Sequence, residues 1–133
     1  MSLWIRFLAL ATLAIACVAG LPQPASAALT WDTATGDGST SSDGGGTWSV
    51  GGPNWNDGAG DVNWSEPNDA IIGAGNGAAG TITVSGTVSP TNLTLNAAGS
   101  GNYTIGGGTI DIPYVGDEGG TMEGITVNAT GTT

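Results

Sequence analysis

From residue 28 onward the chain contains no lysine, arginine, histidine or cysteine, because its single basic residue is Arg6 and its single cysteine is Cys17. Without cysteine this segment has no disulfide framework, and the usual zinc and copper sites are excluded because histidine is missing too. Catalytic triads that need a histidine base are excluded as well. All eleven acidic residues lie beyond position 30, so the segment carries a side-chain charge of −11 and has no electrostatic basis for binding nucleic acid.

Residues 1–27 differ from the rest of the chain and have the pattern of an export signal. Arg6 supplies a positive charge, the residues from there to Leu21 are almost all apolar, and Ala25-Ser26-Ala27 fits a signal-peptidase site. The apolar run is shorter than a membrane span requires. We therefore expect cleavage after Ala27, a secreted or cell-surface product, and no membrane span after processing. A lipoprotein signal that uses Cys17 is the alternative.

Residues 28–79 form a segment rich in tryptophan, glycine, asparagine and aspartate. Trp48, Trp55 and Trp64 follow one another within seventeen positions, and turn-forming residues separate them. A polar tract at 35–46 predicts a loop or a disordered stretch. We expect the tryptophans to cap an apolar core; on the surface they would instead form a platform for glycan contact, as in a carbohydrate-binding module.

From residue 80 onward apolar and polar residues alternate with a period of two, which is the pattern of half-buried strands. Glycine-rich turns separate these strands, and the segment after the signal has no helical periodicity. The predicted strands are 81–84, 92–95, 102–105, 109–112 and 124–127.

These strands recur at nearly constant intervals. The interval from Ile82 to Tyr103 and the interval from Ile105 to Ile125 differ by a single position. This spacing predicts an all-β protein built as a short parallel β-helix, or β-solenoid, in which each coil adds a strand above its predecessor. An antiparallel β-sandwich is the alternative, because Gly106-Gly107-Gly108 has the length of a hairpin turn.

The predicted organisation has three parts. Residues 1–27 are a helical signal peptide, residues 28–79 are a tryptophan-rich N-terminal cap segment, and residues 80–133 are solenoid rungs that we expect to be truncated.

Several short motifs occur in a fixed order: Leu29-Thr30-Trp31-Asp32, Gly46-Thr47-Trp48, Pro53-Asn54-Trp55, Asp61-Val62-Asn63-Trp64, Asn68-Asp69-Ala70-Ile71-Ile72, Gly80-Thr81-Ile82-Thr83-Val84 and Asn92-Leu93-Thr94-Leu95. This order resembles the start of exported bacterial proteins with autotransporter-associated β-strand repeats. The resemblance implies a β-helical passenger that works as a structural or adhesive segment at the cell surface. Its implied partners are extracellular glycans or further rungs of the same polypeptide. The sequence differs from the family pattern because it contains no long repeat array.

Oxygen-rich turns are the places where the sequence offers metal ligands. Asp57 and Asp61 lie in an Asn/Asp/Gly stretch whose oxygens suit calcium, although the spacing does not fit an EF-hand loop. Asp117, Glu118 and Glu123 form a second acidic group. We expect such residues to bond their own turns, with no cofactor required and with calcium as the alternative.

No catalytic residue is predicted. Asp61 with Glu66 or Asp69 is the carboxylate group that would suit glycoside hydrolysis. A β-helix enzyme that acts on acidic polysaccharide would also need arginine or lysine, which the segment after the signal lacks. We therefore expect a protein that is not an enzyme.

Overall fold

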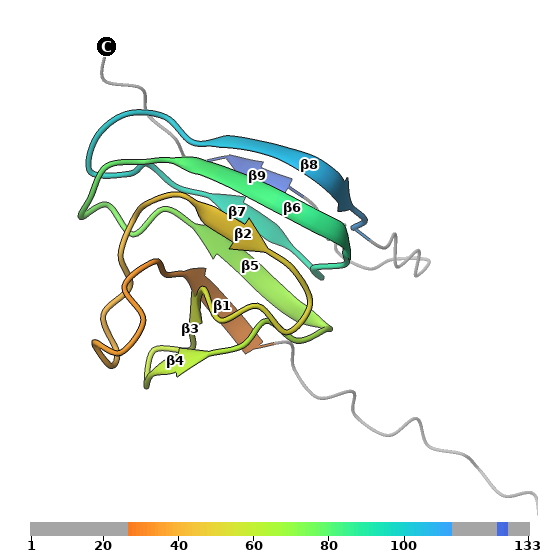
Figure 1. The fold of residues 1–133 in the computed structure, drawn as a ribbon, viewed down its shortest axis with the longest axis horizontal. Helices are drawn as coiled ribbons and strands as arrows, with labels where there is room; N and C mark the ends of the chain where they lie inside the picture. Colours follow the sequence, from red (N-terminus) through yellow and green to blue (C-terminus); the bar gives the residue numbers. More distant parts are fainter. Residues whose placement is uncertain (1–26, 113–124, 128–133) are drawn as a thin grey trace, which may run out of the picture.

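The computed structural model describes residues 27–112 and 125–127, which form strands, turns and bends (Figure 1). No helix occurs in these ranges, so the part of the chain that the structure describes holds no helix able to cross a membrane. The prediction of an all-β protein is confirmed. The predicted signal helix with Ala25, and the acidic group at 117–123, lie outside the described residues.

Two sheets contain all the described strands. Sheet I consists of β1 (Ala27–Trp31), β3 (Trp55–Asn56), β4 (Asp61–Val62), β5 (Asn68–Ile72), β7 (Leu93–Leu95) and β9 (Ile125–Val127), in the order β4-β3-β1-β5-β7-β9. Sheet II consists of β2 (Gly46–Trp48), β6 (Thr81–Val88) and β8 (Thr104–Ile110), in the order β2-β6-β8. Apart from β3 and β4, the chain alternates between the two sheets.

Successive strands of each sheet pair in parallel, while β3 pairs antiparallel with β1 and with β4. Ala70 lies opposite Leu93 and Ile82 lies opposite Ile105, so the two sheets repeat at the same interval. The predicted interval, which places Tyr103 opposite Ile82, is therefore wrong because it is two positions too short. Since side chains alternate with a period of two, the predicted inward face is unchanged.

One further feature of the predicted strand pattern is wrong, and the turn required by the alternative sandwich is not formed. Ile125 lies opposite Leu93 in sheet I and not above Ile105. The hairpin that the alternative antiparallel sandwich would place at Gly106-Gly107-Gly108 is not formed, because these glycines lie within β8, which pairs with β6. The register shifts between Val84 and Thr87, where glycine permits the irregular backbone.

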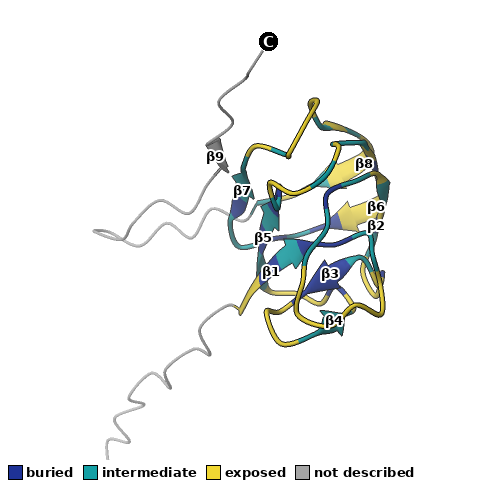
Figure 2. Cartoon of the chain, turned by 90° about the vertical axis from the view of Figure 1, so that its left-hand side faces the viewer, coloured by how far each residue is buried: buried dark blue, intermediate teal, exposed yellow. Residues whose placement is uncertain are grey.

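The core lies between the two sheets, and tryptophan dominates it near the antiparallel strands. Figure 2 shows sheet I and sheet II as two layers with the buried strand β3 near the lower end. Trp31, Trp48, Trp55 and Trp64 are at most 1% exposed. Their ring centroids lie 4.5–5.4 Å apart in four contacts. Each such pair contributes about 0.5–1.5 kcal/mol beyond area burial, so these rings anchor this end of the core.

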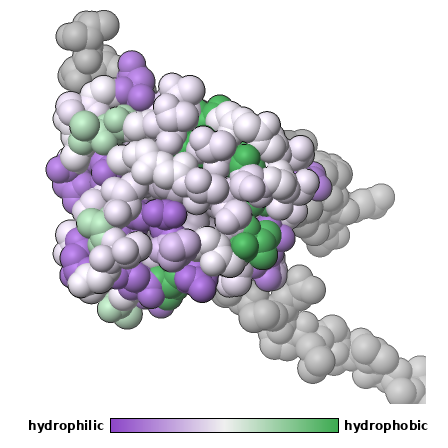
Figure 3. Space-filling view, in the orientation of Figure 1, coloured by the Kyte–Doolittle hydropathy of each residue, from purple (hydrophilic) through white to green (hydrophobic). Residues whose placement is uncertain are grey.

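Aliphatic side chains continue the core along the stack. The fully or nearly buried ones come from both sheets and are Leu29, Ala70, Ile72, Ile82, Val84, Val88 and Leu93. The outer face viewed in Figure 3 carries only scattered hydrophobic spots.

Each sheet contains strands from both sides of the segment boundary predicted at residue 80. β2 pairs with β6, and β5 pairs with β7, so strands of the predicted cap segment and of the predicted rung segment share each sheet. The two segments therefore form one stack.

Candidate metal centre

Three aspartates gather where the antiparallel strands extend sheet I. Asp32 follows β1, Asp37 lies in the loop between β1 and β2, and Asp61 begins β4. One carboxylate oxygen from each residue lies within 4.8 Å of the other two. The strand pairing explains why Asp32 and Asp61 lie close together. Asn56 of β3 pairs with Thr30 of β1 on one side and with Asp61 of β4 on the other.

Asp32 is the buried member of this cluster, with no exposed surface. Its Oδ1 accepts the backbone N–H groups of Ala34 at 2.9 Å and Ser42 at 3.0 Å. Burial raises the pKa of Asp32, those two hydrogen bonds lower it, and the nearby carboxyl groups of Asp61 and Asp37 raise it, so the net direction is upward. The ionised form of Asp32 is thus less favoured than that of an ordinary exposed aspartate.

The amide of Asn56 lies between the cluster's oxygens and is 1% exposed. Its Oδ1 accepts the N–H of Gly58 at 2.8 Å, which fixes the amide so that Nδ2 faces the acidic group. Three oxygens lie within hydrogen-bond distance of Nδ2: the Gly38 carbonyl at 2.5 Å, Asp61 Oδ1 at 3.4 Å and Asp32 Oδ2 at 3.5 Å. An amide nitrogen has two hydrogens. Among the described donors, Asp32 Oδ2 therefore has only a shared contact at the outer limit of hydrogen-bond distance.

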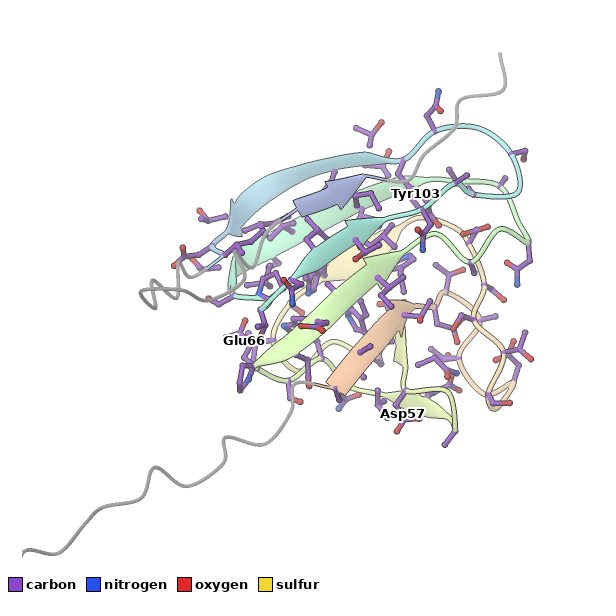
Figure 4. The ribbon with its side chains drawn as sticks, turned by 180° about the vertical axis from the view of Figure 1, so that it is seen from behind. Asp57, Glu66 and Tyr103 are labelled. Atoms are coloured by element: carbon purple, nitrogen blue, oxygen red, sulfur yellow. The ribbon has the colours of Figure 1, made fainter. Side chains whose placement is uncertain are left out.

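Of the two predicted calcium ligands, Asp61 belongs to this cluster and Asp57 does not. Asp57 is exposed, and its Oδ1 accepts the N–H groups of Ala59 at 2.8 Å and Gly60 at 2.9 Å. These bonds lower the pKa of Asp57. Figure 4 shows Asp57 at the outside of the turn between β3 and β4. The prediction that aspartates bond their own turns thus describes Asp57.

Sequence reasoning did not connect Asp32 and Asp37 with this site. Both lie more than twenty residues before Asp61, and no local spacing motif joins the three. The one signal that the sequence offered was the position of Asp32, directly after the Leu29-Thr30-Trp31 strand.

A second buried aspartate, Asp43, has different surroundings. It lies just before β2 and is 8% exposed. Its Oδ2 accepts backbone N–H groups from Asn76 at 2.8 Å, Gly77 at 2.9 Å and Gly99 at 3.0 Å. Those donors lie in the connections from β5 to β6 and from β7 to β8, so one side chain links three successive crossings from sheet I to sheet II.

The other oxygen of Asp43 completes the link. Oδ1 accepts the N–H of Ala74 at 2.7 Å and the hydroxyl of Tyr103 at 2.8 Å. Figure 4 shows Tyr103 beside the connection that leads into β8. Burial raises the pKa of Asp43, but the hydrogen bonds, led by those from Gly77 and Tyr103, outweigh it and lower the pKa to about 2. Burial and the bond to Asp43 raise the pKa of the Tyr103 hydroxyl.

The tryptophans named as a core cap or a glycan platform are buried. Trp48 and Trp55 have no exposed surface and Trp64 is 1% exposed. The indole N–H groups of Trp48 and Trp55 have no hydrogen-bond partner among the described residues, whereas that of Trp64 donates to Glu66 at 3.4 Å. Buried indoles cannot stack on a sugar ring, so the exposed platform does not exist at these three positions.

The carboxylates considered for glycoside hydrolysis make separate contacts. Glu66 Oε1 accepts the N–H of Ser89 as well as the indole N–H of Trp64. Asp69 Oδ1 accepts from the Asn92 amide at 3.1 Å. Figure 4 shows Glu66 at the start of β5, well away from Tyr103. Glu66 thus joins the β4–β5 connection to the residue that follows β6, and Asp69 joins β5 to the residue that precedes β7.

Comparison with protein-family models, with curated proteins and with solved structures finds no match to this chain.

Proposed function

We propose that this chain is a short parallel β-helix that serves as an exported, non-catalytic structural segment of a cell-surface or secreted passenger protein. Its role in this proposal is to present a rigid surface, as a stalk or adhesive scaffold. Further coils of the same polypeptide or extracellular glycans would meet that surface. The resemblance to proteins with autotransporter-associated β-strand repeats points in the same direction.

The observation that carries the proposal is the continuous parallel pairing in both sheets. Leu29, Ala70, Leu93 and Ile125 lie opposite one another in successive strands of sheet I. Sheet II repeats the arrangement through β2, β6 and β8 while the chain alternates between the sheets. A chain that crosses repeatedly between two parallel ladders builds a coil, and such a stack can be extended without changing the contacts already made.

Asp43 supports a mechanical role for this stack, because one side chain joins three successive crossings of the chain. Hydrogen bonds to a carboxylate contribute more than neutral ones, about 1.5–3 kcal/mol each before non-additivity. The link therefore resists separation of neighbouring coils.

The burial of Trp48, Trp55 and Trp64 argues against the second candidate, a carbohydrate-binding module that uses exposed indoles. In the proposed structural role these rings fill the end of the core, where each buries a large apolar area.

The coil proposal is tested by duplicating one complete coil. The pairing of Ala70 with Leu93 defines that coil as residues 70–92, which we would repeat in tandem in the processed chain. The matched control inserts the same residues in scrambled order at the same place. We expect the duplicated protein to lengthen by about one strand spacing, ~4.8 Å, in small-angle scattering. Its urea m-value should also rise, because more surface becomes buried in one cooperative unit.

The scrambled insertion should form an unpaired loop and leave the m-value near that of the parent. Equal m-values and scattering profiles for the duplicated and scrambled proteins would overturn the coil proposal, and with it the structural role that depends on extension.

A further inference from the structure

Sheet II ends at β8, and the outer edge of this strand has no partner among the described strands. β6 pairs along one side of β8, and the order β2-β6-β8 places no described strand on the other side. Figure 1 shows β8 as the outermost strand of sheet II. We propose that this edge pairs antiparallel with the same edge of a second copy of the chain, so that two stacks join end to end in a symmetric dimer. The inference goes beyond the proposed function and rests on the contacts of sheet II alone.

The main chain of β8 is open to solvent in the middle of the strand. Gly106, Gly107 and Gly108 are all exposed, and because glycine has no side chain, their exposed surface is main chain. Figure 2 shows β8 in the colour of exposed residues over much of its length. An open edge presents unpaired N–H and C=O groups, and another strand can add to a sheet through such groups.

β8 is also the longest of the described strands that lie at a sheet edge. β2, β4 and β9 contain three, two and three residues, whereas β8 contains seven. Proteins protect exposed edges with short strands, with lysine or other charged side chains, or with proline. The sequence of β8, TIGGGTI, contains none of these residues. The edge is therefore long and unprotected.

The hydrogen-bonding groups of β8 suit pairing with an identical strand. Thr104 and Asp111 donate their N–H groups to carbonyl groups at the two ends of β6. Because main-chain groups alternate in direction along a strand, the N–H groups of Ile105 and Ile110 point to the free edge. A two-fold axis then places Ile105 of one copy opposite Ile110 of the other, and the two residues exchange a pair of main-chain hydrogen bonds.

The inward side chains favour the same pairing. Ile105 and Ile110 are half-buried, whereas Ile82 and Val88, which lie opposite them on β6, have no exposed surface. A second β8 would cover the parts of both isoleucines that remain in contact with water, and burial of apolar area stabilises the pair. Glycines face one another at the centre of the pair, so no side chain obstructs the approach of the two main chains.

Charge selects this edge as the place where two copies can meet. The segment after residue 27 contains eleven acidic residues and no basic one, so two copies repel each other over most of their surface. β8 and β9, the last described strands of the two sheets, contain no charged residue. In the proposed pair Asp111 lies opposite Thr104, whose hydroxyl can donate a hydrogen bond to the carboxylate. The pairing therefore brings no two acids face to face.

The molar mass of the purified processed chain in solution tests the proposal. We expect light scattering after gel filtration to show a single copy at low concentration. The mass should double as the concentration rises and should then stay constant, because the dimer uses the β8 edge of both copies.

The decisive variant is Ile110→Pro, which removes an N–H group that points away from β6 and therefore leaves the β6–β8 pairing intact. The dimer loses one hydrogen bond on each side of its axis, so we expect the dissociation constant to rise at least about ten-fold. The matched control is Ile110→Val, which keeps the N–H group and has a side chain similar in size to proline. It should dimerise as the parent does.

A second variant tests the edge without changing a half-buried residue. Gly106→Glu adds a charged side chain at an exposed position where a Cβ atom meets nothing within 4 Å. A charge at an edge protects it from pairing, so we expect weaker dimerisation. The matched control, Thr47→Glu, adds the same charge at an exposed position of β2 in the same sheet and should behave as the parent. Circular dichroism of each variant verifies that the strands still form.

Three results would overturn the proposal. One is a parent that keeps the mass of a single copy at every concentration, as when another part of the same polypeptide covers β8. Another is equal dimerisation of each variant and its control, which would place the contact elsewhere. The third is a mass that rises beyond two copies, because head-to-tail stacking has no closed symmetry.

Discussion

Asp32 and Asp43 are two buried aspartates eleven positions apart whose surroundings oppose one another. Five donors, four backbone N–H groups and one hydroxyl, surround the carboxylate of Asp43. Asp32 has two backbone donors, both on Oδ1, and the carboxylates of Asp37 and Asp61 lie nearby. The pKa of Asp43 is lowered and that of Asp32 is raised.

The comparison shows that burial alone does not decide the state of a carboxylate. Desolvation raises the pKa of both residues, and the net direction then depends on the hydrogen-bond donors and on the neighbouring carboxyl groups around each one. Asp43 therefore stabilises the fold as an anion without help from solution. Asp32 is less favoured as an anion, because it receives fewer donors and faces the carboxyl groups of Asp61 and Asp37.

Substitution of Asp43 should have the largest effect on stability. In Asp43→Asn an NH₂ group replaces one of the two acceptor oxygens. This NH₂ group would face backbone N–H groups that donate to the carboxylate in the parent, so those buried donors lose their acceptor. We expect the free energy of unfolding to fall by at least about 3 kcal/mol in urea titration.

The control for this substitution is Asp111→Asn, at an exposed position that removes the same charge. It should change the free energy of unfolding by less than about 0.5 kcal/mol. If the two variants are equally stable, the link through Asp43 contributes nothing and the contrast with Asp32 disappears.

The second largest effect is expected in the free energy of unfolding at acidic pH. The folded-state pKa of Asp43 is about 2, below its ordinary value of 3.8, so its contribution is complete above pH 3.8 and is lost as the pH falls toward 2. The shift corresponds to about 2 kcal/mol. We expect the parent to lose that much more stability than Asp43→Asn between pH 5 and pH 2 in urea titrations. Parallel curves for the two proteins would contradict the lowered pKa.

Asp32→Asn should have the smallest effect on the free energy of unfolding, and in the opposite direction. The amide keeps the Oδ1 acceptor for Ala34 and Ser42, and its new N–H groups can donate to Asp61. We expect the free energy of unfolding to stay unchanged or to rise by up to about 1 kcal/mol in urea titration.

A different result for Asp32→Asn would remove the contrast between the two aspartates. A loss above about 2 kcal/mol, which is the size expected when a satisfied buried charge is removed, would show that the protein already satisfies the carboxylate of Asp32.

The prediction of strand positions from the sequence was largely correct where apolar and polar residues alternate. The segments around Ile82, Leu93 and Ile125 are strands, and Ile82 and Leu93 are buried. Register was harder to predict, because glycines such as Gly86 and Gly107 allow an irregularity that changes the length of a repeat. The glycine triplet was ambiguous for a related reason, since glycine suits a position within a strand as well as the hairpin turn of the alternative sandwich.

The candidate site was predicted only in part. Asp61 lies in an oxygen-rich stretch that a sequence can reveal, and Asp57 shares that stretch but closes its own turn. Asp43 gave no signal, because its polar Gly/Ser/Asp tract resembles any exposed loop. The donors to Asp43 lie 31–60 residues further along the chain, and only folding brings them to one place.

The sequence by itself determined the class of the fold and the charge of the molecule. Period-two alternation needs only neighbouring residues, and the lack of cations after Arg6 is a matter of composition. The tertiary structure alone decided that two aspartates of similar burial meet opposite environments. Hydrogen bonds and charge repulsion act over a few ångströms in space, and the stacked strands place residues at that distance irrespective of how far apart they lie in the chain.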